Sequence, residues 1–358
     1  MTTRGLRTTY VDRSSDILAS VIVLNWNGER FLGACLDSLR RQTFTGLETI
    51  LVDNGSTDGS VELVKRDFHD VKVVALDRNI GFSAGNNEGI RRARGRYVAL
   101  MNNDAEADPH WIEEIVEALK SHPEAGMCAS KILLYDNRAL ADSCGDFYSV
   151  EGVAGKIGHL ESQECYEESR EVFGACAGAA IYRRSMLEEL GGFDEDFFIV
   201  HEDSDLNFRA QLLGYRCIYV PTAVVYHHLG ATIGKGSDRA VYFSQRNTEF
   251  VYLKNMPLVL LLKYWPLHVL ADVVSFGAHI ARGKTRAFIS AKLDALRMMP
   301  GVIRKRRQIQ KARRASAADI DRWLERGWLW ERLHRGLDAG MWSQQAQPGA
   351  SGEERLGE

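Results

Sequence analysis

The chain has 358 residues, of which 45% are hydrophobic and 26% charged, a composition typical of a soluble globular protein with one large domain or a domain and an appendage. The net charge of -3 hides an uneven distribution, because residues 282–314 contain 12 Lys or Arg and one acid, a local net charge of +11. Such a segment indicates an anionic partner. The polar N-terminus argues against a signal peptide. None of the six cysteines forms a CxxC pair, so we expect reduced thiols in a cytosolic protein.

Apolar runs alternate with helical patterns through the first third of the chain. The runs span residues 19–26, 48–54, 71–77 and 96–102, and helical patterns follow them at residues 28–42, 58–68, 83–94 and 109–122. Repeated units of this kind predict a parallel sheet with helices on both faces. Ligands of such sheets bind at the carboxyl ends of the strands. Polar clusters stand at those ends here, at Asn25, Asp53, Asp77–Arg78 and Asn102–Asp104. No GxGxxG motif follows a strand, which disfavours a dinucleotide-binding fold.

The rest of the chain changes from strands to helices. Residues 123–180 are irregular and glycine-rich, residues 203–213 have a helical pattern, and residues 216–226 resemble a strand. From about Tyr242 the sequence is helical, first apolar and then basic. Charged residues and a proline interrupt the apolar stretch 256–281, so it predicts a helix pair lying on a membrane surface rather than spanning it. We therefore divide the chain into a flexible N-terminus (1–18), an α/β domain (19–245), a helical extension (246–340) and a disordered tail (341–358).

The second and third strands end in a turn and a glycine-rich loop. In "VDNGSTDGS", Asp53 closes the strand and Asp58 can cap the next helix, but the Asp53 carboxylate can also accept hydrogen bonds from a nucleoside. In "DRNIGFSAGNNEGI", glycines permit close approach of the backbone, and Arg78 offers donors to a base or phosphate, with Asn86 nearby. A plain βα turn and a plain loop before a helix are the structural alternatives.

The stretch "YVALMNNDAEAD" places an acid directly after the fourth strand. A nucleoside-diphosphate substrate needs its charge neutralised before the leaving group departs, and Mg²⁺ or Mn²⁺ held by carboxylate and phosphate oxygens does this. Asp104 is the expected metal ligand. The two asparagines before it offer only weak neutral oxygens, and Glu106 can reach the site if the turn is tight. Asp108 is expected to cap the helix that Pro109 opens.

Acids gather around aromatic residues in "FDEDFFIVHEDSDLNFR". Glu202 and Asp203 stand at the start of a helix, where the dipole favours ionised carboxylates, and a carboxylate beside an apolar pocket suits a general base. Plain helix capping is the alternative. We expect Asp205 only to pair with Arg209 one turn later. The pair His227–His228 ends the last strand, where a neutral imidazole can complete a metal site or be structural.

Taken together, these stretches resemble the inverting glycosyltransferases of family 2. That family has the GT-A fold, a mainly parallel, Rossmann-like sheet flanked by helices. The ordered set runs from about Ser20 to Pro257 and comprises "SVIVLNWNG", "LVDNGSTDGS", "RNIGFSAGNNEGI", "YVALMNNDAEAD", "GACAGAAIYRRSML", "GGFDEDFFIVHEDSDLNFRAQLLGY" and "VVYHHLGAT". The chain is most similar to the bacterial rhamnosyltransferase-like branch, which builds cell-envelope polysaccharides. "SQRNTEFVYLKNMP", followed by an apolar and then basic helical tail, is also similar to that branch.

The resemblance implies a role for each matching residue. The donor nucleotide would contact Asn25, Asp53, Arg78, Asn86 and Asn103, the Mg²⁺ or Mn²⁺ ion would bind Asp104 and His227, the general base would be Asp203, and Glu202 would orient it or the acceptor. Asp203 would take the proton of the attacking hydroxyl in a single, inverting displacement. Many relatives carry two acids in the DxD-like element, whereas this chain has one, so we expect the metal to bind well only together with the nucleotide sugar.

The same resemblance implies the substrates. We expect dTDP-rhamnose as donor, with UDP-sugars second, and a lipid-linked or saccharide acceptor in cell-envelope polysaccharide synthesis. The alternatives are a nucleotidyltransferase on a similar α/β sheet and a non-catalytic nucleotide-sugar-binding protein. The apolar and basic C-terminal segments predict a peripheral position on the anionic inner face of the cytoplasmic membrane, with a hairpin packed on the domain or used for dimerisation as the alternative. No nucleic acid is expected, because residues 282–314 hold only one aromatic side chain.

Overall fold

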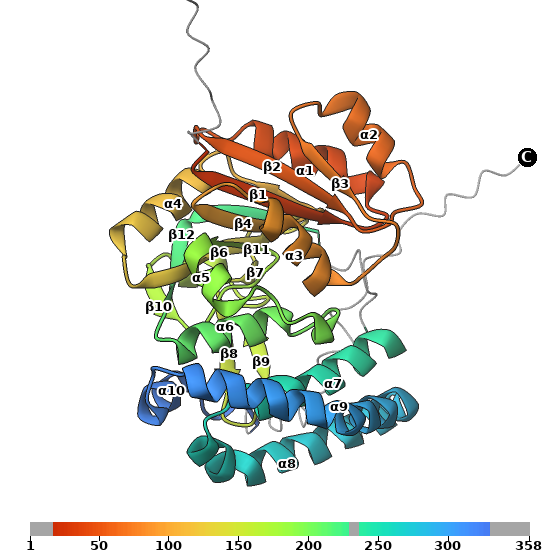
Figure 1. Ribbon diagram of the computed structural model, residues 1–358, viewed down its shortest axis with the longest axis vertical. Helices are drawn as coiled ribbons and strands as arrows, with labels where there is room; N and C mark the ends of the chain where they lie inside the picture. Colours follow the sequence, from red (N-terminus) through yellow and green to blue (C-terminus); the bar gives the residue numbers. More distant parts are fainter. Residues whose placement is uncertain (1–16, 229–235, 330–358) are drawn as a thin grey trace, which may run out of the picture.

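A ten-stranded, mainly parallel sheet forms the centre of the computed structural model, which describes residues 17–228 and 236–329 (Figure 1). The strand order is β10 (Arg170–Val172), β12 (Arg216–His227), β6 (Ala125–Leu134), β11 (Ala179–Arg183), β4 (Tyr97–Asn102), β1 (Ala19–Asn25), β2 (Leu47–Asp53) and β3 (Lys72–Ala75), with β5 (Ala105–Ala107) on β12 and β7 (Ala141–Ser143) on β6. Strands β4, β1, β2 and β3 are parallel, whereas β11 runs antiparallel between β4 and β6. The predicted α/β sheet is therefore confirmed.

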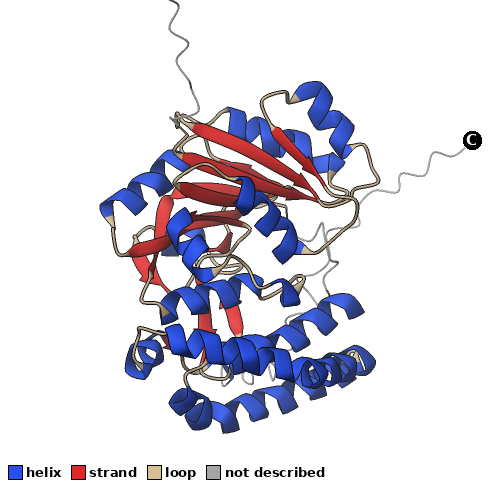
Figure 2. Ribbon diagram, viewed as in Figure 1, coloured by secondary structure: helices blue, strands red, loops and turns tan. Residues whose placement is uncertain are grey.

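Both faces of this sheet are covered, which explains why its strands are continuously apolar. Side chains of successive β1 residues point to opposite faces: Val21 and Val23 join one buried core, and Ile22 joins the other. Helices α1 (Glu29–Arg40), α2 (Ser60–Asp67) and α4 (Trp111–Ser121) cover the first face, and α3 (Phe82–Arg92), α5 (Arg184–Leu190) and α6 (Glu202–Leu212) cover the second. Figure 2 shows the strands between these helices.

Two predicted helix starts differ from the observed ones in detail. Asp58 accepts a hydrogen bond from the N–H of Ser60, the first residue of α2, as expected of a capping acid. Asp108 accepts one from the N–H of His110, but α4 begins only at Trp111. Pro109 therefore precedes the first turn and does not open it, because the carbonyl of Asp108 closes a separate turn onto the N–H of Trp111.

A third layer consists of helices stacked beneath α6 (Figure 1). It contains α7 (Asp238–Asn255), α8 (Leu258–Ala281), α9 (Thr285–Ala312) and α10 (Ala317–Trp323), together with a small sheet of β8 (Asp146–Ser149), β9 (Ala154–Lys156) and β13 (Leu324–Glu325). The short 3-10 helices Gln163–Tyr166 and Glu195–Phe197 complete the elements. Aromatic side chains such as Phe208, Phe250 and Tyr264 fill the core between α6 and this layer.

The predicted division of the chain can be compared with these elements only in part. Helix α7 runs through the predicted boundary between residues 245 and 246, so the change from strands to helices comes several residues earlier. The predicted N-terminal segment, apart from Ile17 and Leu18, and the predicted tail 341–358 lie outside the described residues. Among the helices that the structure describes, α8 alone is long and apolar enough to cross a membrane by length and composition.

Candidate active site

A cavity of ≈ 360 Å³ lies where β1, β4 and β12 end. This is the edge of an open α/β sheet at which ligands bind. The lining residues come from nine segments of the chain: Leu24, Trp26, Asn54, Asn79, Gly81, Phe82, Asn102, Asn103, Lys156, Cys176, Ala177, Gly178, Phe198, Ile199, Val200, Glu202, Asp203, His227 and Arg239. A larger hollow of ≈ 750 Å³ lies where the strands begin, but its Arg94, Arg183 and Arg184 already bind Glu48, Glu188 and backbone carbonyls.

Two carboxylates flank the ring of His227 beside this cavity. Asp104 Oδ1 lies 3.2 Å from His227 Nε2, and Asp142 Oδ2 lies 2.9 Å from His227 Nδ1. Burial alone would lower the pKa of His227, but its contacts with the two carboxylates outweigh it and raise this pKa to about 9. The structure thus brings together Asp104 and His227, which are more than a hundred positions apart in the sequence.

The donor set of this cluster fits a divalent cation. Asp104 Oδ1 is buried and accepts no well-aligned hydrogen bond from the described residues, so one carboxylate oxygen is available beside an imidazole nitrogen. Carboxylate oxygen is the preferred ligand of Mg²⁺, and Mn²⁺ accepts oxygen and imidazole nitrogen. A metal-binding histidine usually donates its other ring N–H to a carboxylate, as His227 Nδ1 can to Asp142.

A lysine in the cavity wall belongs to the same network. Lys156 Nζ donates to both oxygens of Asp142, at 2.8 and 2.9 Å, and its side chain lines the cavity. Lys156 and Arg239 are the Lys and Arg side chains among the lining residues. Their position gives the cavity a positive contribution that suits an anionic group such as a diphosphate.

Two adjacent acids at the start of α6 differ in environment although both line the cavity. Asp203 is partly exposed, accepts the N–H of Ser204 at 2.7 Å and lies 3.4 Å from the N–H of Ala177. Backbone donors of this kind stabilise a carboxylate. Glu202 is 6% exposed and its Oε2 has no hydrogen-bond partner among the described residues. Burial, and then the charge of Asp203, raise the pKa of Glu202 well above its usual range, which favours its protonated form.

The loop before these acids has a strained backbone that α7 holds in place. Three non-glycine residues within 198–201 have φ between 63° and 72°, a region that such residues rarely adopt. The Asn247 side chain lies within 3.0 Å of three carbonyl oxygens at or next to this loop, and Arg246 donates to one of these three and to the Asp196 carbonyl. The Phe198 carbonyl in turn accepts the N–H of Phe82 at the start of α3. The motif "SQRNTEF" therefore shapes the cavity from α7.

Three predicted nucleotide-binding residues form a network of their own. Asn25 Nδ2 donates to Asp53 Oδ1 at 3.0 Å, and Asn103 Nδ2 donates to Asn25 Oδ1 at 2.7 Å. Asn25 and Asp53 are buried and do not line the cavity, whereas Asn103 does. The network fixes the ends of β1, β2 and β4 relative to one another, and direct contact of Asn25 and Asp53 with a nucleoside stays a prediction.

The other two predicted nucleotide-binding residues also lie outside the cavity wall. Arg78 is exposed and has no hydrogen-bond or ion-pair partner within the described residues. Asn86 is buried in α3, where its amide donates to the Phe82 carbonyl at 3.0 Å. Asn54 lines the cavity instead, and it bonds the neighbouring loop through the Gly81 carbonyl.

Several open or structural alternatives are also resolved. Glu106 faces His228 rather than Asp104, with Oε1 and Nε2 3.9 Å apart, and His228 stacks on Tyr135 with ring centroids 3.6 Å apart. Asp205 pairs with Arg209 at 2.8 Å, which confirms the predicted pair one helical turn apart. All six cysteines are free thiols; four are buried, Cys165 is exposed and Cys176 lines the cavity.

The sequence pattern did not indicate Asp142, Lys156, Asn54 or Arg239. Asp142 and Lys156 lie on β7 and β9, short strands within the glycine-rich stretch 123–180, where no regular pattern predicted an element. Their only signal was an ionisable residue on a short apolar segment. Arg239 lies just after a part of the chain that the structure does not describe.

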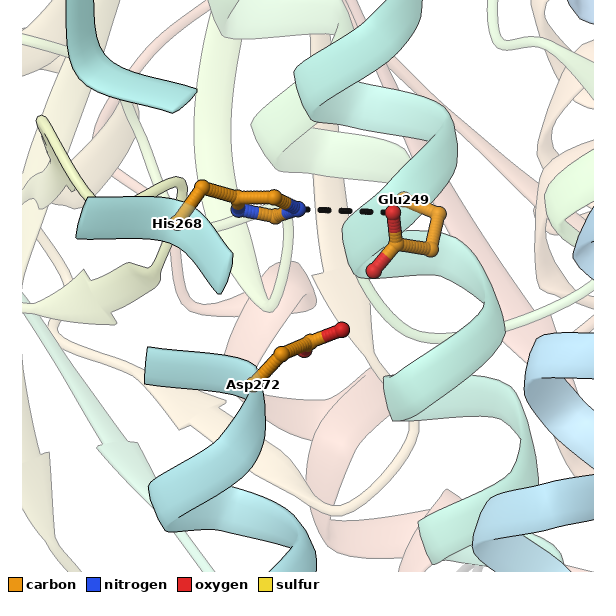
Figure 3. Close-up of side chains that lie close together, drawn as sticks. All are labelled: Glu249, His268 and Asp272. Atoms are coloured by element: carbon orange, nitrogen blue, oxygen red, sulfur yellow. Dashed lines mark hydrogen bonds and ion pairs between the residues drawn. The ribbon is translucent and has the colours of Figure 1, made fainter. Parts of the chain in front are cut away.

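A second cluster of acids around a histidine lies in the helical layer. Glu249 of α7 and His268 and Asp272 of α8 point toward one another, and their potential ligand atoms all lie within 4.8 Å (Figure 3). Lys292 Nζ donates to both Glu249 and Asp272, and His268 donates to the Glu151 carbonyl at 2.7 Å. An ammonium group therefore already neutralises these carboxylates, and the cluster is an ion-pair network between three helices.

Comparisons with known proteins agree with this fold. The family described as Glycosyl transferase family 2 matches residues 20–191. The chain is 28% identical over 246 residues to N-acetylglucosaminyl-diphospho-decaprenol L-rhamnosyltransferase of Mycobacterium tuberculosis, a match covering 62% of this chain and 79% of that protein. It is 28% identical over 230 residues to O-antigen biosynthesis protein RfbC of Myxococcus xanthus, covering 60% of this chain but 17% of RfbC. An uncharacterized protein of Sinorhizobium fredii is 29% identical, covering 71% of this chain and 28% of that one. The chain thus spans less than a third of the length of the last two relatives.

Solved structures share the same architecture. The structure of Staphylococcus aureus TarS 1–349 in complex with UDP-GlcNAc matches with a TM-score of 0.56 and 20% identity, covering 89% of this chain and 92% of that one. GalNAc-T7 with UDP, GalNAc and Mn²⁺ matches with a TM-score of 0.54 and 17% identity, covering 66% and 48%. These likenesses concern the fold. Residues 20–191 thus match glycosyltransferase family 2, and the chain has the GT-A fold.

Proposed function

We propose that this glycosyltransferase transfers a hexose with inversion from a nucleoside-diphosphate sugar, and that Asp203 is its general base. The observation that carries the proposal is a single cavity lined by Asp203, His227 and Lys156, with Asp104 directly behind His227. A base and a set of groups for a diphosphate therefore face the same space. A purely binding site for an anionic diphosphate would gain little from Glu202 and Asp203, and this disfavours a non-catalytic role.

In the proposed reaction, the oxygen of an acceptor hydroxyl forms a bond to the anomeric carbon of the donor. The bond from that carbon to the diphosphate oxygen breaks, and the nucleoside diphosphate leaves with the bonding electrons. Asp203 takes the hydroxyl proton, which suits the half-exposed carboxylate held by backbone N–H groups. Glu202, with its raised pKa, can donate a hydrogen bond that orients the acceptor.

The leaving diphosphate is negatively charged and needs cationic groups around it. We propose that Asp104 and His227 hold Mg²⁺ or Mn²⁺, which when bound would neutralise the phosphate oxygens of the leaving group. Asp142 orients the His227 ring, and Lys156 and Arg239 can hold phosphate oxygens from the cavity wall. With one firm carboxylate, the metal should bind well only when the nucleotide sugar supplies further oxygens.

The nucleoside itself should bind near the ends of β1, β2 and β3. We propose that Asn103 and Arg78 contact it, and that Asn25 and Asp53 act through the network that positions Asn103. Asn86 would contribute by shaping the first turn of α3. If these roles are correct, substituting any of these residues should raise the dissociation constant of the donor and leave the proton-transfer step intact.

The donor and acceptor follow from the relatives only as proposals. The name of the Mycobacterium tuberculosis relative favours dTDP-rhamnose as donor, and the TarS complex with UDP-GlcNAc makes UDP-sugars the second choice. The same rhamnosyltransferase and the Myxococcus xanthus O-antigen protein favour a lipid-linked or saccharide acceptor in cell-envelope polysaccharide synthesis. A nucleotidyltransferase on a similar sheet is the competing enzyme class.

A panel of nucleotide sugars with Mn²⁺, scored by thermal shift and by hydrolysis, tests the proposal. The donor should raise the melting temperature and be hydrolysed slowly. Asp203→Asn should lower turnover by on the order of 10²–10⁴-fold with nearly unchanged donor affinity, because a general base is lost. Asp77→Asn, an exposed acid at another strand end, is the matched control. Near-wild-type turnover of Asp203→Asn would refute the assignment.

A further inference from the structure

The helical layer carries almost all of the large apolar side chains that the described residues expose. Twelve of the thirteen lie on α8 and α9, and the thirteenth is Leu160. Those on α8 recur every three or four residues from Leu258 to Ile280, whereas Leu260, Tyr264, His268 and Ala271 between them are buried. This spacing places the exposed side chains on one side of the helix.

The apolar sides of α8 and α9 join into one surface. A shallow cavity of ≈ 450 Å³ runs between the two helices and is lined mainly by apolar side chains, among them Trp265, Val269, Val273, Leu293 and Leu296. We call the exposed apolar side chains of residues 258–303 the α8–α9 face. Figure 1 shows helices α8 and α9 at the end of the molecule opposite α1 and α2. Contiguous exposed apolar surface of this kind marks an interaction site.

The charges around this face identify its partner. Of the 12 basic residues in 282–314, six bind groups of the protein itself: Lys284, Lys292, Arg297, Lys305, Arg306 and Arg314. The segment is therefore less available to an outside partner than its net charge of +11 suggested. Five others are exposed and have no partner within the described residues: Arg282, Arg286, Arg304, Arg307 and Lys311. Arg286 stands three residues before Ile289 and Arg307 four residues after Ile303, so these two cations lie beside exposed apolar side chains of α9.

We propose that the α8–α9 face lies on an anionic lipid bilayer. Apolar side chains would enter the interface while the five free cations meet lipid phosphates, the pattern of helices that lie in the plane of a membrane. Helix α8 does not cross the bilayer in this proposal, because its Lys263 and Asp272 pair with Asp321 and Lys292 of the same chain. A second copy of the chain is the less suitable occupant, since it would bring the same cations against each other.

A groove lies between the helical layer and the loop that precedes Glu202. It has a volume of ≈ 490 Å³, lies between α7 and α8, and extends from Arg282 and His279 to His201, the residue before Glu202. Its wall mixes polar side chains such as Ser244 with apolar ones such as Val274. We infer that an acceptor anchored in the bilayer reaches Asp203 along it, and this part of the inference rests on the proposed function.

Vesicle flotation of the full chain without nucleotide sugar tests the surface directly. The protein should float with vesicles of phosphatidylcholine and phosphatidylglycerol, less with phosphatidylcholine alone, and less as salt rises. Arg304→Gln/Arg307→Gln should weaken binding about 30-fold, at about 1 kcal/mol for each cation, whereas Lys65→Gln/Lys72→Gln on α2 and β3 should not. Leu262→Glu should weaken binding at least about tenfold, whereas Leu160→Glu should not.

Three results would overturn the inference. These are no flotation at low salt, equal losses in the α2–β3 controls, and a dimer in light scattering that Leu262→Glu converts to monomers while neither form binds vesicles. The last result would identify a second copy as the occupant. Because flotation needs no catalysis, a chain that binds vesicles but transfers no sugar would contradict the proposed function and leave the bilayer inference intact.

Discussion

Two clusters in this molecule consist of a histidine between two acids, and they differ in what surrounds them. In the sheet domain, His227 lies between Asp104 and Asp142, and one oxygen of Asp104 is buried without a well-aligned hydrogen bond. In the helical layer, His268 lies beside Glu249 and Asp272, and Lys292 bridges the two carboxylates. The first cluster leaves a buried carboxylate oxygen unpaired, whereas in the second an ammonium group pairs with both carboxylates.

The comparison shows that residue types alone do not define a metal site. Both clusters satisfy the requirement of carboxylate and imidazole groups within a few ångströms, yet an ammonium group already neutralises one of them. Asp142 also has a lysine partner, Lys156, but that pair leaves Asp104 untouched. The free oxygen of Asp104, rather than the histidine, is therefore the feature that distinguishes a candidate ligand site from a structural ion-pair network.

Replacing the carboxylate of Asp104 should have the largest effect on turnover. Asp104→Asn should lower turnover by on the order of 100-fold or more, because several kcal/mol of charge stabilisation on the leaving group are lost. The thermal shift that Mn²⁺ produces together with the donor should disappear as well. Asp272→Asn, the corresponding change in the helical layer, should leave that shift in place. Equal Mn²⁺-dependent shifts in wild type and Asp104→Asn would remove the distinction between the clusters.

A change at Asp142, which contacts the ring of His227, should have a weaker effect on the same site. Asp142→Asn keeps the size of the side chain but weakens the hold on the His227 ring, and such changes typically cost about 10–100-fold in metal affinity or activity. Higher Mn²⁺ concentrations should recover much of the turnover, which a purely structural defect would not allow. A Mn²⁺ titration of wild type and variant gives the comparison, and an unshifted midpoint would assign Asp142 to stability alone.

The sequence predicted the sheet better than it predicted the surroundings of His227, for a physical reason. Strands such as β1 and β4 are buried on both faces, so their apolar runs are unambiguous, and Asp104 and Asp203 follow directly from the ends of regular elements. Asp142 and Lys156 lie on three-residue strands whose position depends on pairing with distant parts of the chain. No local pattern encodes that pairing.

The net charge of a segment was the poorest guide to the surroundings of its side chains in the fold. The basic segment after residue 281 indicated an anionic partner, but Lys305 binds Asp194 and Asp196 in the loop that leads to Glu202 and Asp203. A charge count cannot show which acids distant in sequence will fold against a basic helix. The apolar pattern of α8 similarly could not reveal which of its sides would be buried.

Removing the lysine from the Glu249–His268–Asp272 cluster should change stability rather than catalysis. Lys292→Met leaves Glu249 and Asp272 without their cation. Breaking a fully buried pair costs about 3–5 kcal/mol, and because the Lys292 side chain is 20% exposed, we expect about 1–3 kcal/mol. If the ammonium group is what excludes a metal, Mn²⁺ should raise the melting temperature of this variant more than that of wild type. Calorimetry with and without Mn²⁺ decides, and a variant as stable as wild type would refute the role of Lys292.

The smallest expected effect is the pH dependence of the stability that the His268–Glu249 contact contributes. Burial alone would lower the pKa of His268, but Glu249 outweighs it and raises that pKa. Burial would raise the pKa of Glu249, but the same contact with His268, together with Lys292, lowers it to about 2. The stabilisation from His268 is therefore complete below about pH 6.5 and is lost as pH rises through its folded pKa, whereas that from Glu249 is lost only as pH falls below about 4.3. The stability gap between wild type and His268→Gln should thus be widest near pH 5–6 and shrink by about 1 kcal/mol toward pH 9. Exposed His122→Gln should show no such trend, and a gap that is constant with pH would mean that His268 acts only by packing.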